Sequence, residues 1–104
     1  MAETCYIVGT GSYAPPRRLT NEDLERMVDT SDEWITTRTG IKERRIADPS
    51  VAASDLAYEA GTRALATAEM TAEELDLIVV GTVTPDHLFP SCACSLQSRL
   101  GAKN

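Results

Sequence analysis

The chain has 104 residues, and ten basic against sixteen acidic side chains give it a formal net charge of −6. Nucleic-acid-binding domains usually carry the opposite imbalance, which argues against that class. No apolar run reaches the length of a membrane-spanning helix, and the N-terminus lacks the basic and apolar regions of a signal peptide. The sequence therefore predicts a cytoplasmic protein with no nucleic-acid or membrane partner, whose three cysteines are reduced thiols.

The first half of the chain predicts a strand, two helices and a charged arm. Residues 6–8 are apolar and partly β-branched, which indicates a buried strand. Thr20 and Ser31 each suit a helix N-cap, because a hydroxyl accepts the free N–H groups of a first helical turn. The second helix is expected to end at Gly40 in a left-handed cap. Residues 41–48 are rich in charge and are expected to form an exposed strand or arm.

The second half predicts a long helix, a buried strand and a last helix. Residues 51–70 repeat alanine and leucine at helical spacing, and their small residues would let a neighbour approach closely. Thr71 with Glu74 resembles a capping box that opens one more helical turn. Residues 77–83 are nearly all apolar without alternation, which is typical of a central strand covered on both faces. A last helix is expected over residues 91–100.

The order of these elements predicts an α/β layered fold with a mostly internal sheet. Two buried strands do not make a stable sheet alone, so the sheet lacks neighbours within this sequence. The chain is therefore expected to be one part of a larger α/β domain.

Three patterns invite a functional interpretation that the residues do not support. The Gly-Thr-Gly-Ser run at residues 9–12 follows a predicted strand, but the prolines at residues 15–16 exclude the helix of a phosphate-binding loop. A structural turn is the better interpretation. His87 is the only histidine and has no paired nucleophile in the sequence. Cys92 and Cys94 are better explained as small buried side chains than as metal ligands or reactive thiolates.

Trp34 and Arg38 form the most informative pair. They lie four residues apart in the helix that follows Ser31, so they share one helix face. An indole ring stacks on purine bases, and a guanidinium group grips phosphate oxygens in a bidentate fork. A core tryptophan beside a solvated charged arm explains the same residues equally well. The residues alone leave both interpretations open.

Several motifs together resemble the beta-ketoacyl-acyl-carrier-protein synthase III family. The most specific are Thr30-Ser31-Asp32-Glu33-Trp34-Ile35 and Arg38-Thr39-Gly40-Ile41, with further matches at residues 7–13, 77–80 and 89–91. The resemblance spans the chain and implies an α/β, thiolase-like layered fold that is incomplete here. It implies that residues 1–104 are the N-terminal part of such a domain, truncated before the catalytic cysteine.

The resemblance also implies roles for four side chains. Trp34 would stack on the adenine of coenzyme A, Arg38 would bind its phosphates, and Thr30 would lie beside the same nucleotide. Phe89 would reach across a homodimer and line the partner's acyl pocket. The resemblance assigns no catalytic residue and no metal ligand within this chain.

The activity implied by the resemblance is an acyl transfer that begins fatty acid biosynthesis. An acyl-CoA primer, expected to be acetyl-CoA, would acylate a cysteine, and condensation with malonyl-acyl-carrier protein would give beta-ketoacyl-acyl-carrier protein. Coenzyme A enters as a thioester substrate, and no cofactor is implied. The chain alone would be inactive. Two other functions stay open, a non-catalytic coenzyme A-binding fragment and a related thiolase-fold synthase with another primer.

Overall fold

The structure, a computed structural model, describes residues 4–103, which divide into two compact units. One unit is Ala14–Ser50, and the other joins the chain up to Tyr13 with the chain from Val51 onward. Among the described residues, no helix is both long enough and apolar enough to cross a membrane.

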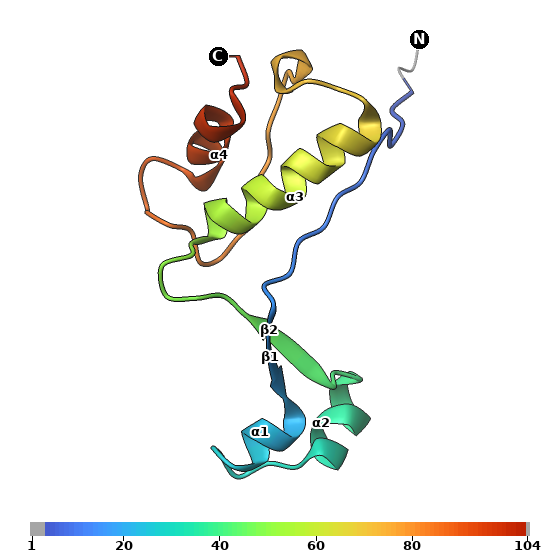
Figure 1. The fold of residues 1–104 in the computed structure, drawn as a ribbon, viewed down its shortest axis with the longest axis vertical. Helices are drawn as coiled ribbons and strands as arrows, with labels where there is room; N and C mark the ends of the chain where they lie inside the picture. Colours follow the sequence, from blue (N-terminus) through green and yellow to red (C-terminus); the bar gives the residue numbers. More distant parts are fainter. Residues whose placement is uncertain (1–3, 104) are drawn as a thin grey trace. The chain divides into compact units, whose positions relative to one another are not determined.

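The unit Ala14–Ser50 is a β-ribbon that carries two short helices. Strands β1 (Arg17–Thr20) and β2 (Glu43–Ile46) pair antiparallel. Between them in sequence lie α1 (Asn21–Glu25) and α2 (Asp32–Thr39), which contact each other at one end of the ribbon (Figure 1). Strand β2 confirms the predicted strand, but three of its four residues are half-buried rather than exposed. Strand β1 was not expected from the sequence.

Both helices of this unit begin at the predicted caps. The N–H of Asp23 donates to Thr20 Oγ1 at 3.2 Å, and the Asp23 carboxylate accepts the Thr20 N–H at 3.0 Å. The N–H of Trp34 donates to Ser31 Oγ at 3.1 Å. Gly40 ends α2 with a φ of 71°, a left-handed value that glycine adopts without steric cost. These local signals fix where each helix starts and stops.

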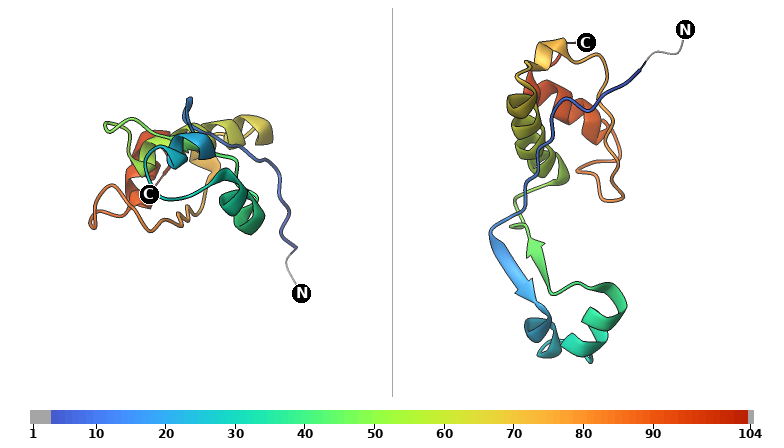
Figure 2. Two further views of the ribbon diagram at one scale, coloured as in Figure 1. Left: turned by 90° about the horizontal axis from the view of Figure 1, so that it is seen from below. Right: turned by 90° about the vertical axis from the view of Figure 1, so that its right-hand side faces the viewer.

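The other unit is built on α3 (Ala53–Ala68), against which α4 (Cys92–Leu100) packs (Figure 2). A single 3-10 turn, η1 (Ala72–Glu74), follows α3. The predicted long helix, the extra turn and the last helix are all confirmed. Ser91 caps α4 by accepting the N–H of Cys94 at 3.3 Å.

The N-terminal segment runs extended along the small-residue face of α3. A Cβ built on Gly9 would lie 2.7 Å from the Ala64 carbonyl oxygen and from Ala68 Cβ. One built on Gly11 would overlap the Ala60 carbonyl oxygen and the Ala64 nitrogen. Glycine and alanine therefore allow the close approach that the sequence predicted for this helix. The turn expected at the Gly-Thr-Gly-Ser run is wrong, because neither a turn nor a bend is formed at residues 9–12 and the chain continues along α3 (Figure 1).

The two predicted buried strands are also wrong. Residues 6–8 and 77–83 pair with no strand among residues 4–103. Most of their side chains face solvent, with Ile7 88% and Val83 97% exposed, whereas Ile78 and Val80 are half-buried. A strand becomes buried only when neighbouring strands and helices cover it, and the helices of the described chain cover these two runs only in part.

Candidate functional site

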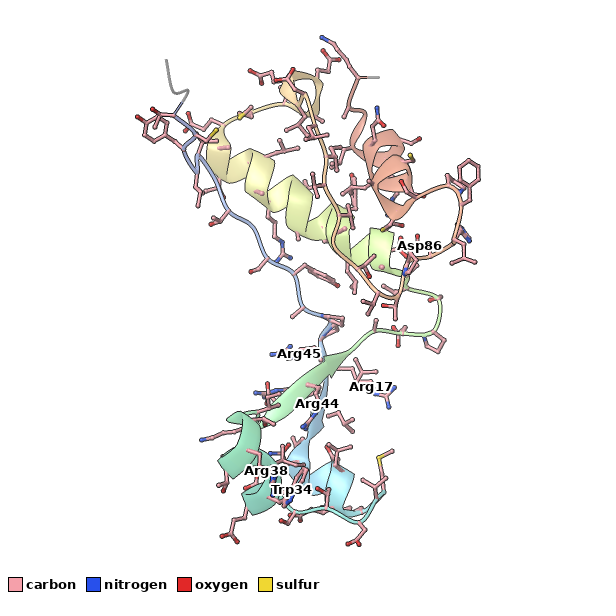
Figure 3. The ribbon with its side chains drawn as sticks, turned by 180° about the vertical axis from the view of Figure 1, so that it is seen from behind. Arg17, Trp34, Arg38, Arg44, Arg45 and Asp86 are labelled. Atoms are coloured by element: carbon pink, nitrogen blue, oxygen red, sulfur yellow. The ribbon has the colours of Figure 1, made fainter. Side chains whose placement is uncertain are left out.

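Helix α2 presents Trp34 and Arg38 together on its exposed face (Figure 3). The guanidinium carbon of Arg38 lies 4.8 Å from the centroid of the Trp34 ring. The Trp34 side chain is 55% exposed, so the interpretation of a core tryptophan is wrong. The pair instead offers a flat aromatic surface and a cation at one place.

Two open hollows of about 360 Å³ each adjoin the Trp34 ring. One extends to Thr30 and the other to Arg38. Their lining residues are Asp29, Thr30, Ser31 and Trp34 for the first, and Ser31, Glu33, Trp34, Thr37 and Arg38 for the second. The structure thus brings together the three residues that the sequence singled out for nucleotide binding, in hollows of a size that suits small ligands.

The start of α2 is held by its neighbours. The N–H of Asp32 donates to Glu25 Oε1 at 2.6 Å, and Asn21 Nδ2 donates to Asp32 Oδ1 at 2.7 Å. Hydrogen bonds from Asn21 and then Thr36 lower the pKa of the Asp32 carboxyl. Asp32 is therefore an anion that accepts hydrogen bonds at the beginning of α2, where the helix dipole also favours negative charge.

Positive charge is concentrated in the unit that carries this site. The protein has ten basic residues, and seven lie in Ala14–Ser50, namely Arg17, Arg18, Arg26, Arg38, Lys42, Arg44 and Arg45. Arg18 pairs with Glu43 at 2.8 Å, and Arg26 pairs with Asp23 at 3.4 Å. None of the ion pairs recorded within residues 4–103 involves Arg38. Its charge is therefore available to an anionic ligand.

The remaining candidates lie in the other unit. Phe89, in the segment that precedes α4, is 91% exposed, and His87 is exposed as well. Cys92 is buried, and burial followed by the nearby Asp86 carboxylate raises the pKa of its thiol. Cys94 is exposed. The prediction of buried cysteines is therefore confirmed for Cys92 and wrong for Cys94.

Sequence reasoning missed Asp86, which caps α3 from a distance. Its carboxylate accepts the Ser54 N–H at 2.9 Å and the Ser54 hydroxyl at 2.5 Å. These hydrogen bonds lower the pKa of Asp86. The N-cap residue Ala52 has no side-chain acceptor, so the carboxylate of Asp86, which is 32 residues from Ser54, takes that place. No local sequence pattern could reveal this pairing.

Across residues 4–103, no group of three or more His, Cys, Asp or Glu side chains is placed to hold a metal ion. The chemistry that the described residues offer is instead the stacking surface and the cation on α2.

The chain is similar to known proteins in both sequence and structure. No protein-family model matches it. The beta-ketoacyl-[acyl-carrier-protein] synthase III of Caldanaerobacter subterraneus subsp. tengcongensis is 69% identical over 98 residues, which cover 94% of this chain and 30% of that protein. The solved 3-oxoacyl-[acyl-carrier-protein] synthase III of Aquifex aeolicus is 56% identical with a TM-score of 0.87, over 94% of this chain and 32% of that one.

A second solved structure widens the comparison. The priming beta-ketosynthase of the R1128 polyketide biosynthetic pathway is 37% identical with a TM-score of 0.86, over 93% of this chain and 30% of that one. The chain thus spans about a third of the length of these proteins. The predicted α/β, thiolase-like layered fold, incomplete in this chain, is confirmed. In sequence and in fold, the chain is similar over nearly its whole length to about a third of a beta-ketoacyl-[acyl-carrier-protein] synthase III.

Proposed function

We propose that this chain contributes the coenzyme A-binding surface of an acyltransferase that begins fatty acid biosynthesis. The enzyme condenses an acyl-CoA primer, acetyl-CoA, with malonyl-acyl-carrier protein to give beta-ketoacyl-acyl-carrier protein. Support comes from the 69% and 56% identity to the synthases III of two organisms.

The observation that carries the proposal is the Arg38 guanidinium over the exposed Trp34 ring. Coenzyme A ends in a purine nucleotide with several phosphate groups. Adenine stacks on the indole of Trp34, since every base offers a π-face to an aromatic side chain. Arg38 binds phosphate oxygens through its planar fork. Thr30 lines the adjoining hollow, where its hydroxyl meets the same nucleotide.

The proposal extends to the assembly and its location. Residues 1–104 are the N-terminal part of one thiolase-like domain in a cytoplasmic homodimer. Phe89 lines the acyl pocket of the partner subunit, and its 91% exposure supports a contact outside its own chain. Coenzyme A and carrier-protein thioesters are substrates, and no cofactor takes part.

A second candidate is a synthase that uses another primer, as in polyketide biosynthesis. It is supported by the 37% identity to the R1128 priming ketosynthase at a TM-score of 0.86. The higher identity to the fatty acid enzyme of Aquifex aeolicus, at 56%, favours the first candidate. Turnover by a full-length enzyme that contains this chain, offered acetyl-CoA together with longer acyl-CoA thioesters, separates the two.

Measuring the binding of the nucleotide part of coenzyme A tests the proposal directly. Isothermal calorimetry would compare acetyl-CoA, adenosine 3′,5′-bisphosphate and acetyl-pantetheine. We expect the first two to bind and the third, which lacks the nucleotide, to bind far more weakly. Trp34→Ala should weaken nucleotide binding about fivefold or more, because stacking on one base contributes ~1–3 kcal/mol.

A matched control is Tyr6→Ala, which truncates an aromatic side chain that is 79% exposed in the other unit. This variant should bind adenosine 3′,5′-bisphosphate as the unaltered chain does. A folded chain that binds neither nucleotide, or a Trp34→Ala variant with unchanged affinity, would contradict the proposal.

A further inference from the structure

Asn21 is a buried polar side chain whose amide is fully hydrogen-bonded. Only 2% of its surface is exposed. Its Nδ2 donates to Asp32 Oδ1 at 2.7 Å, to the Ile41 carbonyl oxygen at 2.8 Å and to Thr36 Oγ1 at 3.4 Å. Its Oδ1 accepts from Arg44 Nη1 at 2.6 Å. One amide thus joins the start of α2, its middle, the chain that leaves it, and strand β2.

The contacts of Asn21 and the nucleotide-binding pair lie on opposite faces of α2. Asp32 and Thr36 are one helical turn apart and face Asn21. Trp34 and Arg38 each follow two residues later, which places them about 200° further round the helix. A rotation of α2 that broke the Asn21 contacts would therefore turn the aromatic pair away from its present direction.

We infer that Asn21 is a positioning residue for nucleotide binding. It fixes the rotation of α2 and both of its ends, so that Trp34 and Arg38 already have their binding arrangement before a ligand arrives. A site organised in advance binds more tightly because less freedom is lost on binding. The inference rests on the nucleotide-binding function proposed above.

The pattern of partners explains why an amide occupies this position. Asp32 and the Ile41 carbonyl are acceptors and require a donor, while Arg44 is a donor and requires an acceptor. Asparagine supplies both from one planar group. Aspartate has the same shape, but it would place a second carboxylate against the Asp32 carboxylate and the Ile41 carbonyl. Asn21→Asp therefore reverses the polarity of the contact without a change in volume.

The test uses Trp34 as its own reporter, because it is the only tryptophan in the chain. Near-ultraviolet circular dichroism and fluorescence emission report its surroundings without ligand, and calorimetry gives the Kd for adenosine 3′,5′-bisphosphate. Asn21→Asp, measured below its unfolding temperature, should change both Trp34 signals and raise the Kd about tenfold, equivalent to about 1.4 kcal/mol.

Ser54→Ala is the matched control, since Ser54 is a polar side chain that is 4% exposed in the other unit. It should lower the unfolding temperature and leave both Trp34 signals and the Kd unchanged. If Asn21→Asp behaves in the same way, Asn21 only stabilises the fold and the inference is overturned.

A rescue variant covers the case in which Asn21→Asp does not fold. Combining Asn21→Asp with Asp32→Asn reverses donor and acceptor and removes the repulsion between carboxylates. It should recover the Trp34 signals at least in part, and recovered folding without them overturns the inference. If the unaltered chain binds no nucleotide, the proposed function fails, while the ligand-free Trp34 signals still decide the role of Asn21.

Discussion

The guanidinium group of Arg38 covers one face of the Trp34 indole, with 4.8 Å between its central carbon and the ring centroid. A base that stacks on this tryptophan would use the other face. The cation and the ring hold each other in place by an attraction of about 0.5–1 kcal/mol at an exposed site. Trp34 and Arg38 therefore form one coupled pair rather than two independent side chains.

Replacing Arg38 separates its charge from its shape. Arg38→Lys keeps the charge but loses the planar fork and the ring contact, so the affinity for adenosine 3′,5′-bisphosphate should fall several-fold. Arg38→Gln should bind more weakly still and with a smaller dependence on salt. Calorimetry at two salt concentrations measures both effects.

The control is Arg26→Lys, which alters an exposed arginine of the same unit and should leave nucleotide affinity unchanged. Equal affinities of the lysine and arginine forms at position 38 would rule out the bidentate role.

The contact between the N-terminal segment and α3 predicts that replacing two different glycines by alanine changes the free energy of unfolding by different amounts. A Cβ on Gly11 would overlap backbone atoms of α3, whereas one on Gly81 meets nothing within 4 Å. Gly11→Ala should lower the free energy of unfolding by about 1–3 kcal/mol, because a helix backbone cannot move aside as a side chain can. Gly81→Ala should change it by less than about 0.5 kcal/mol. Urea denaturation measures both, and a similar loss in the two variants would contradict the close approach.

Acidification should loosen the start of α3 through Asp86. Hydrogen bonds from Ser54 hold the pKa of Asp86 below its ordinary value of 3.8. A carboxyl whose pKa is depressed by folding stabilises the protein above its unfolded-state pKa, and this contribution is lost as the pH falls through the folded-state value. The helical circular dichroism should therefore weaken as the pH drops below about 4.

Asp86→Asn should weaken this pH dependence, while Glu59→Gln, on the exposed side of α3, should not. Identical acid profiles for all three forms would show that Asp86 does not act as a cap.

The three cysteines should differ in reactivity. Cys5 and Cys94 are exposed, whereas Cys92 is buried and burial raises the pKa of its thiol. Because the thiolate is the reactive form, a maleimide at neutral pH should modify two thiols quickly and Cys92 slowly. Mass spectrometry of the digested protein identifies each site. Labelling of Cys92 at the rate of Cys94 would contradict the packing of α4 on α3.

Local signals in the sequence predicted the helices of this chain well. Thr20, Ser31 and Ser91 begin helices as expected, and Gly40 and Gly101 end them with left-handed φ values of 71° and 74°. A cap depends on residues only a few positions away, so a short stretch of sequence contains the whole interaction. The same holds for Trp34 and Arg38, whose common face follows from their spacing on one helix.

Interactions between distant residues could not be predicted in the same way. Strand β1 pairs with β2 through contacts such as Arg18 with Glu43, which are 25 residues apart. The partners of Asn21 are 11 to 23 residues away, and nothing in its own neighbourhood marks it as a buried junction. For the apolar runs at residues 6–8 and 77–83, the sequence predicted burial that the structure does not show. Apolar character indicates a preference for burial, but it does not show whether other strands or helices are present to cover the segment.

The apolar runs at residues 6–8 and 77–83 also affect how copies of the chain associate with one another. Each presents outward apolar side chains on an extended backbone that pairs with no strand among residues 4–103, and such a backbone is a template for β-pairing between molecules. The net charge of −6 opposes this association by mutual repulsion. Salt screens that repulsion over a distance of about 10 Å at 0.1 M, while it leaves the apolar attraction intact. The colloidal stability of the molecule is therefore electrostatic, and concentrated solutions should cloud as the ionic strength rises.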